Sequence, residues 1–141
     1  MTPEQIELVQ RAWGRVTALN NTYVQEVYTE LFRLSPDLIN LFPDPAGMPV
    51  TKVSETLNTV ITSLEQLDAL GFIIRDLGRR HRQFNVQSHQ FGLLKQALTL
   101  VLARRLGEYF TPALYEAWSQ MYDEIAALML EGLGQHTPSV V

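Results

Sequence analysis

His81 lies in a stretch, from Ile74 to Val86, that holds four of the chain's 11 basic residues. Its neighbours at helical spacing, Leu77 and Phe84, are apolar, so its imidazole is expected to face the interior. An inward imidazole needs a polar partner, and its Nδ1–H can reach the backbone carbonyl of Leu77. In that tautomer Nε2 carries the lone pair and can bind a metal. The pattern allows two interpretations, a satisfied core histidine and a metal ligand.

The other residues that could do chemistry narrow the choice. The chain has no cysteine, which excludes disulfides, thiolate nucleophiles and iron–sulfur clusters. A zinc site is disfavoured because the two other histidines, His89 and His136, have no helical ligand spacing to His81. The sequence also lacks a phosphate-binding glycine loop and the metalloprotease and serine-hydrolase motifs. Any metal must be held by histidine, carboxylate, methionine or tyrosine side chains.

Size and charge indicate a single domain. The 141 residues, 46% of them apolar, suffice for one core, which we expect within residues 1–133, with a frayed tail at 134–141. With 15 acidic and 11 basic residues the chain repels polyanions, so nucleic acid is not an expected partner. No apolar run could span a bilayer and no leader-like segment follows Met1. We expect a soluble, unprocessed, cytoplasmic protein.

The elements that must position His81 are helices. Apolar residues recur at helical spacing almost throughout, which predicts an all-α fold of six or seven helices. Helices are expected at about residues 3–16, 24–34, 50–64, 70–84, 89–106 and 112–129, with a short turn at 36–42 and a proline-rich loop at 43–49. Thr2 and Thr111, each followed by proline, are typical caps. Trp13 and Trp118 lie on apolar faces and are predicted core residues.

Three segments carry a family resemblance. Residues 31–42 (LFRLSPDLINLF), 77–82 (LGRRHR) and 110–122 (FTPALYEAWSQMY) resemble segments of haem globins, in that family's order and separations. The chain is most similar to neuroglobins and to bacterial single-domain globins, from about Ile6 to Met129. The resemblance implies a globin fold of about 6–8 helices around a haem pocket, and haem b as the cofactor. It also implies a bacterial protein, as a monomer or weak dimer.

The resemblance assigns roles on the proximal side of the haem. His81 matches the iron ligand, and Phe42 matches the phenylalanine stacked on the porphyrin. Lys52 and Arg80 could pair with the propionates, although each could equally be a solvated surface charge. The remaining expected cofactor contacts are Val53, Leu77, Val86 and Phe91.

On the distal side, Pro49 stands where most globins carry a histidine or glutamine, and Val53 matches a residue over the ring. No histidine precedes His81, so bis-histidine coordination is not expected. The sixth iron position is then open or water-filled, or is reached by Met48 or Tyr28. Tyr28 could instead donate a hydrogen bond to bound O2, or be an ordinary core tyrosine. The predicted distal pocket comprises Tyr28, Phe32, Pro49, Val53 and Leu57.

These assignments predict reversible binding of a diatomic gas, foremost O2, with CO and NO as further ligands, for carriage or scavenging. One alternative is a haem redox enzyme, such as a nitric oxide dioxygenase, a nitrite reductase or a peroxidase-like enzyme, supplied by an external reductase. Another is a gas or stress sensor. Flavohaemoglobins carry a tyrosine and a glutamate that polarise the proximal histidine, whereas the matching positions here are Phe91 and Leu133. This difference, with the lack of a reductase domain, argues against a self-contained nitric oxide dioxygenase.

Overall fold

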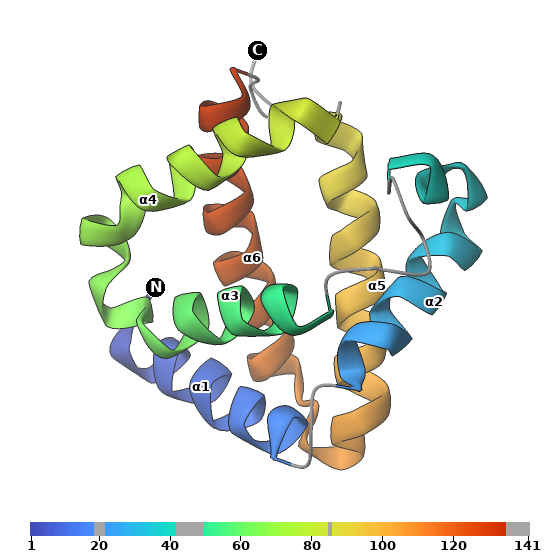
Figure 1. Ribbon diagram of the computed structural model, residues 1–141. Coiled ribbons are helices and arrows are strands. Elements are labelled where there is room, and N and C mark those ends of the chain that lie inside the picture. Colours follow the sequence, from blue (N-terminus) through green and yellow to red (C-terminus); the bar gives the residue numbers. More distant parts are fainter. Residues whose placement is uncertain (19–21, 42–49, 85, 135–141) are drawn as a thin grey trace.

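The computed structural model describes residues 1–18, 22–41, 50–84 and 86–134, which form helices joined by short connections (Figure 1). The predicted all-α class is confirmed. The α-helices are α1 (Pro3–Thr17), α2 (Tyr23–Leu34), α3 (Val50–Thr62), α4 (Leu67–Arg80), α5 (Ser88–Leu106) and α6 (Pro112–Leu133). Short 3-10 helices occur at η1 (Pro36–Leu41), η3 (Leu64–Gln66), η4 (His81–Phe84) and η5 (Gly107–Tyr109).

Both predicted threonine caps are present. At the start of α1 the Gln5 N–H donates to the Thr2 hydroxyl at 3.1 Å, and the Thr2 N–H donates to the Gln5 side chain at 2.9 Å. At the start of α6 the Leu114 N–H donates to the Thr111 hydroxyl at 3.2 Å. Gly107 ends α5 with a φ of +54°, a conformation that favours glycine. Local hydrogen bonds therefore set these helix ends.

An aromatic cluster joins the helices at the centre of the core. The rings of Trp13 (α1) and Trp118 (α6) stack with centroids 6.1 Å apart, and Tyr23 (α2) meets Trp13 edge-on at 5.1 Å. All three side chains are buried, which confirms the two tryptophans as core residues. The Trp13 indole donates to Asn58 at 3.3 Å, and the Tyr23 hydroxyl donates to Ser54 at 3.1 Å. These two bonds attach α3 to α1 and α2.

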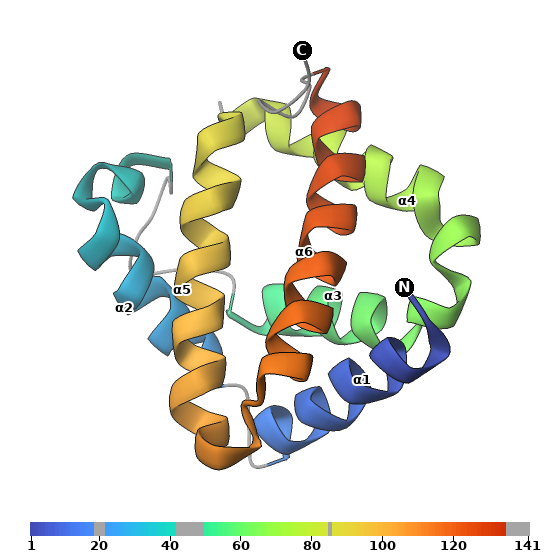
Figure 2. The same ribbon diagram turned by 180° about the vertical axis from the view of Figure 1, so that it is seen from behind.

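Ion pairs attach α2 to α5, which lie side by side in Figures 1 and 2. Glu30 is only 8% exposed and accepts hydrogen bonds from Arg104 at 2.7 Å and Arg33 at 2.9 Å. These bonds, that from Arg104 foremost, lower the pKa of Glu30. Glu26 pairs with Arg105 one turn earlier. The rotation of α2 against α5 is thereby fixed.

The end of α4 differs from the sequence prediction. Instead of one helix through Phe84, α4 ends at Arg80 and His81 begins the 3-10 helix η4. The backbone N–H of His81 donates to the Gly78 carbonyl three residues back, and this short bond tightens the last turn of the helix. Ile73, an apolar residue of α4, is 48% exposed.

Two predicted segments, the loop at 43–49 and the tail from 135 onward, lie outside the described residues, and Gly134 caps α6. Within the described ranges, no helix combines the length and apolarity needed to cross a membrane.

Candidate functional site

His81 stands where α4 passes into η4, and its imidazole is half-buried. Its Nδ1 lies 2.7 Å from the Leu77 carbonyl oxygen, so the hydrogen bond predicted from the sequence is present. A carbonyl can only accept, so Nδ1 must carry a proton, and in the neutral tautomer with that proton Nε2 has the lone pair. A neutral imidazole oriented in this way is the form that binds iron or another metal.

The arginines around His81 are paired with other groups. Arg79 and Arg80 share the carboxylate of Asp76, with Arg80 at 3.3 Å. The hydrogen bond from Arg79 lowers the pKa of Asp76. Arg75 and Arg82 bond to residues of α6. Among the predicted propionate partners, Arg80 is therefore already engaged.

The predicted proximal contacts lie on α4, in the segment before α5 and in the first turn of α5. Leu77 precedes His81 by one helical turn, Val86 precedes α5, and Phe91 lies in the first turn of α5; all three are half-buried. The Phe91 carbonyl accepts a hydrogen bond of 2.6 Å from the Tyr122 hydroxyl of α6. Burial raises the pKa of Tyr122, with the neighbouring Asp123 charge as a lesser cause. Tyr122 thus holds the start of α5 against α6.

On the distal side, Tyr28 and Phe32 of α2 stack with ring centroids 6.1 Å apart. Tyr28 belongs to the main core cluster, and Phe32, Val53 and Leu57 pack against that same cluster. Burial raises the pKa of Tyr28, so its hydroxyl stays protonated and able to donate. Four of the five predicted distal residues are thus part of the domain core or packed against it.

The remaining predicted site residues either lie at the surface or the helix end, or fall outside the described residues. Lys52 is exposed in the first turn of α3. Phe42, Met48 and Pro49 lie outside the described residues. Leu133, at the position expected to match the flavohaemoglobin glutamate, is buried at the end of α6.

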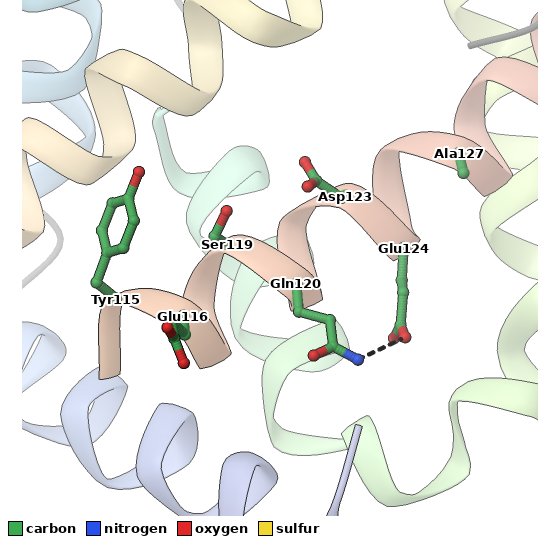
Figure 3. A pocket seen from close by; sticks show the side chains of 7 residues that line it. All are labelled: Tyr115, Glu116, Ser119, Gln120, Asp123, Glu124 and Ala127. Atoms are coloured by element: carbon green, nitrogen blue, oxygen red, sulfur yellow. Dashed lines mark hydrogen bonds between the residues drawn. The ribbon is translucent and has the colours of Figure 1, made fainter. Parts of the chain in front are cut away.

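A surface hollow drawn in Figure 3 lies away from these residues. Its lining comes from successive turns of one face of α6: Tyr115, Glu116, Ser119, Gln120, Asp123, Glu124 and Ala127. None of the predicted cofactor or gas contacts lines it. A single helix face cannot enclose a ligand, so we regard this hollow as exposed surface. Among the residues that the structure describes, no cluster of three or more metal-binding side chains occurs.

Sequence reasoning missed three features beside the site. The pattern around Tyr122 indicates only an apolar helix face, whereas its bond to Phe91 spans 31 positions. Ile73 lies on the helix face of Leu77 and His81, as its spacing predicts, but its side chain is exposed and is not part of the core. Gly78, in the segment before His81, lies directly on α6.

The comparison with known families agrees with this geometry. A family model described as Globin matches residues 25–129. The chain is 30% identical to a neuroglobin of Danio rerio over 89% of this chain and 87% of that protein. It is 28% identical to a neuroglobin of Tetraodon nigroviridis, over 89% and 88% of the two chains. It is 27% identical to neuroglobin-1 of Oncorhynchus mykiss, over 94% and 92%.

The family model and the match to a neuroglobin show that this helical chain belongs to the globin family, a class of haem proteins. It resembles neuroglobins over most of its length. Globins carry haem, hold its iron by a proximal histidine and bind small gases. The described residues fit that cofactor, because the His81 tautomer presents a nitrogen lone pair beside apolar side chains.

Proposed function

We propose that His81 binds the iron of haem b through Nε2 and that the physiological ligand of this globin is O2, for carriage or scavenging. The observation that carries the proposal is the 2.7 Å hydrogen bond from His81 Nδ1 to the Leu77 carbonyl. It places the proton of the neutral tautomer on Nδ1, so that Nε2 is the nitrogen that can bind the iron, and it orients the ring. When bound, the haem supplies reversible binding of a diatomic gas at its iron.

Apolar side chains on both sides of His81 would hold the porphyrin and exclude water. Ile73 and Leu77 share the helix face of His81, and Val86 and Phe91 come from the segment that follows η4. The exposure of Ile73, an apolar side chain on that face, supports a cofactor contact. Phe42 would stack on the ring, as the family resemblance implies.

Arg80 and Lys52 would pair with the propionates. Asp76 is bonded by both Arg79 and Arg80, so Arg80 can turn to a propionate while Asp76 keeps Arg79. Lys52 is exposed, and its ammonium can therefore reach a carboxylate without a desolvation cost. We also propose residues 1–133 as the limits of the globin domain.

Tyr28 would donate a hydrogen bond to O2 held in the distal pocket. Its phenol stays protonated because burial raises its pKa, and the stack with Phe32 holds the ring. Such a bond contributes about 1–3 kcal/mol in a dry site, or roughly five- to a hundredfold in dissociation rate. Val53 and Leu57 would keep the pocket dry, and Pro49 has no side-chain donor to compete with Tyr28.

The proximal side favours gas binding over redox turnover. The group that accepts the hydrogen bond from His81 Nδ1–H is a neutral carbonyl. A carbonyl polarises an imidazole less than a carboxylate does. The side chains of Phe91 and Leu133 cannot accept a hydrogen bond. An imidazole polarised so weakly gives little electron push toward bound oxygen.

The test is the optical spectrum of the haem-loaded protein in its ferric, ferrous and CO-bound states. His81→Ala should lose haem and the five-coordinate ferrous spectrum, whereas His89→Ala, an exposed histidine of α5, should change neither. Tyr28→Phe should raise O2 dissociation, whereas Tyr115→Phe, an exposed tyrosine, should not. Wild-type protein that takes up no haem, or His81→Ala protein with an unchanged spectrum, would refute the proposal.

A further inference from the structure

Four residues of α4 and η4 lie at spacings that put them on one side of the helix: Gly71, Arg75, Gly78 and Arg82. This side faces the C-terminal end of α6. Figures 1 and 2 show the two helices crossing there, with the end of α4 in yellow-green and the end of α6 in red. His81 follows directly after this end of α4.

The two backbones touch through a reciprocal pair of glycines. A Cβ on Gly78 would overlap the carbonyl oxygen of Met129 in α6, and a Cβ on Gly132 would overlap the carbonyl oxygen of Arg75 in α4. Each helix therefore supplies one glycine and one backbone surface. Any side chain at either position would force the helices apart.

Two polar contacts frame the glycine pair. The Arg75 Nε donates to Glu131 at 2.5 Å, one turn before Gly78. The Arg82 Nη2 donates to the Gly132 carbonyl at 3.1 Å, and that carbonyl belongs to the last turn of α6, where helical N–H partners run out. Both contacts are exposed, so they set geometry more than stability.

The same backbone carries His81. The carbonyl that accepts from the His81 imidazole belongs to Leu77, the residue before Gly78. Arg82 is the residue directly after His81. The residues that touch α6 therefore enclose His81 on both sides in the sequence. A shift of α4 along α6 would carry the Leu77 carbonyl, and with it the imidazole, by the same amount.

We propose that the crossing of α4 and α6 positions His81, with Gly78, Gly132, Glu131 and Arg82 as positioning residues. The inference rests on the proposed role of His81 as the iron ligand. The end of α6 would then fix the position of Nε2, and so how well His81 can hold the iron and how long haem would be retained.

The test compares Glu131→Gln and Arg82→Gln with Asp123→Asn. Asp123 bonds Lys95 of α5 at 2.9 Å, so it is a cross-helix ion pair of α6 that does not involve α4. The readouts are the iron–histidine stretching band in the resonance Raman spectrum of the ferrous protein and the rate of haem transfer to an acceptor protein. We expect a shifted, broadened band and roughly tenfold faster haem loss, as when a group that orients a metal ligand is removed. Arg82→Lys, which retains a donor, should restore most of both.

A second readout needs no haem. Hydrogen exchange of the amides at 77–82 in the apoprotein should accelerate in Glu131→Gln and Arg82→Gln but not in Asp123→Asn. Gly132→Ala should show the largest effects, with Gly92→Ala as its control, because a Cβ on Gly92 meets nothing within 4 Å. The two exposed side-chain variants keep the proposal testable if Gly132→Ala does not fold.

The outcomes separate this proposal from the proposed function. A wild-type iron–histidine band with Glu131→Gln and Arg82→Gln indistinguishable from Asp123→Asn would overturn the positioning role and leave His81 as the ligand. A wild-type spectrum without that band would overturn the ligand role, and the positioning role with it.

Discussion

Tyr122→Phe tests the bond that holds the start of α5 against α6. The Tyr122 hydroxyl is buried and donates to the Phe91 carbonyl at 2.6 Å. Phe91 lies inside α5, so its carbonyl also accepts a helical N–H four residues on and would keep one partner in the variant. The loss is therefore that of one neutral hydrogen bond, about 1 kcal/mol, rather than that of an orphaned acceptor. For a domain of this size, the melting temperature should fall by about 3 °C.

The pH dependence gives a sharper test. Burial raises the pKa of Tyr122 above its ordinary 10.0, so above pH 10 the unfolded chain releases this proton while the folded chain keeps it. The folded state then binds more protons, and wild-type stability falls with rising pH by about 1.4 kcal/mol per pH unit from this group. Tyr122→Phe lacks that contribution. The stability curves of wild type and Tyr122→Phe should cross at about pH 11, and the variant should be the more stable protein at higher pH.

Urea unfolding, followed by far-ultraviolet circular dichroism from pH 7 to 11.5, measures both effects. Tyr23 and Tyr28, whose pKa values burial also raises, are present in both proteins and cancel in the difference. Tyr115→Phe, an exposed change on the same helix, should stay within about 0.5 kcal/mol of wild type at pH 7. A constant difference between wild type and Tyr122→Phe across the whole pH range would refute the reasoning.

Two further predictions concern other parts of the chain. Gly14→Ala should stabilise the protein by about 0.5 kcal/mol, seen as a higher denaturant midpoint, because a Cβ on Gly14, in the last turn of α1, meets nothing within 4 Å; a lower midpoint would contradict this. Glu30→Gln should flatten the acid limb of the stability curve, because bonds from Arg104 and Arg33 lower the pKa of Glu30 and their contribution disappears as pH falls below its unfolded value of 4.5. An acid limb identical to that of wild type would show that the Glu30 ion pairs do not contribute to stability in this pH range.

The features that could be predicted from the sequence depend on residues a few positions apart. The caps at Thr2 and Thr111 span three residues, and the His81 bond to Leu77 spans four. A helical pattern places such partners at known distances, so the residue types suffice. The end of α4 was placed wrongly because His81 to Phe84 form a 3-10 turn, which shares nearly the same apolar spacing as an α-helix.

Contacts between distant segments could not be predicted. The bond from Tyr122 to Phe91 spans 31 positions, and that from Arg82 to Gly132 spans 50. Each of these residues has an ordinary local explanation, as part of an apolar stripe, a charged surface or a helix end. Their partners emerge only when the crossing of two helices is known.

The glycine pair shows why a motif such as LGRRHR specifies less than its residues suggest. It contains the proposed ligand, His81, and Leu77, whose carbonyl accepts from its imidazole, but it contains only half of the contact that holds their helix. The other half is Gly132, whose missing side chain leaves no periodic signal in the sequence. A chain that kept LGRRHR and replaced Gly132 would have to move α4 away from α6, and His81 with it. Retention of the histidine segment alone is therefore insufficient evidence that a relative holds its iron ligand in the same place.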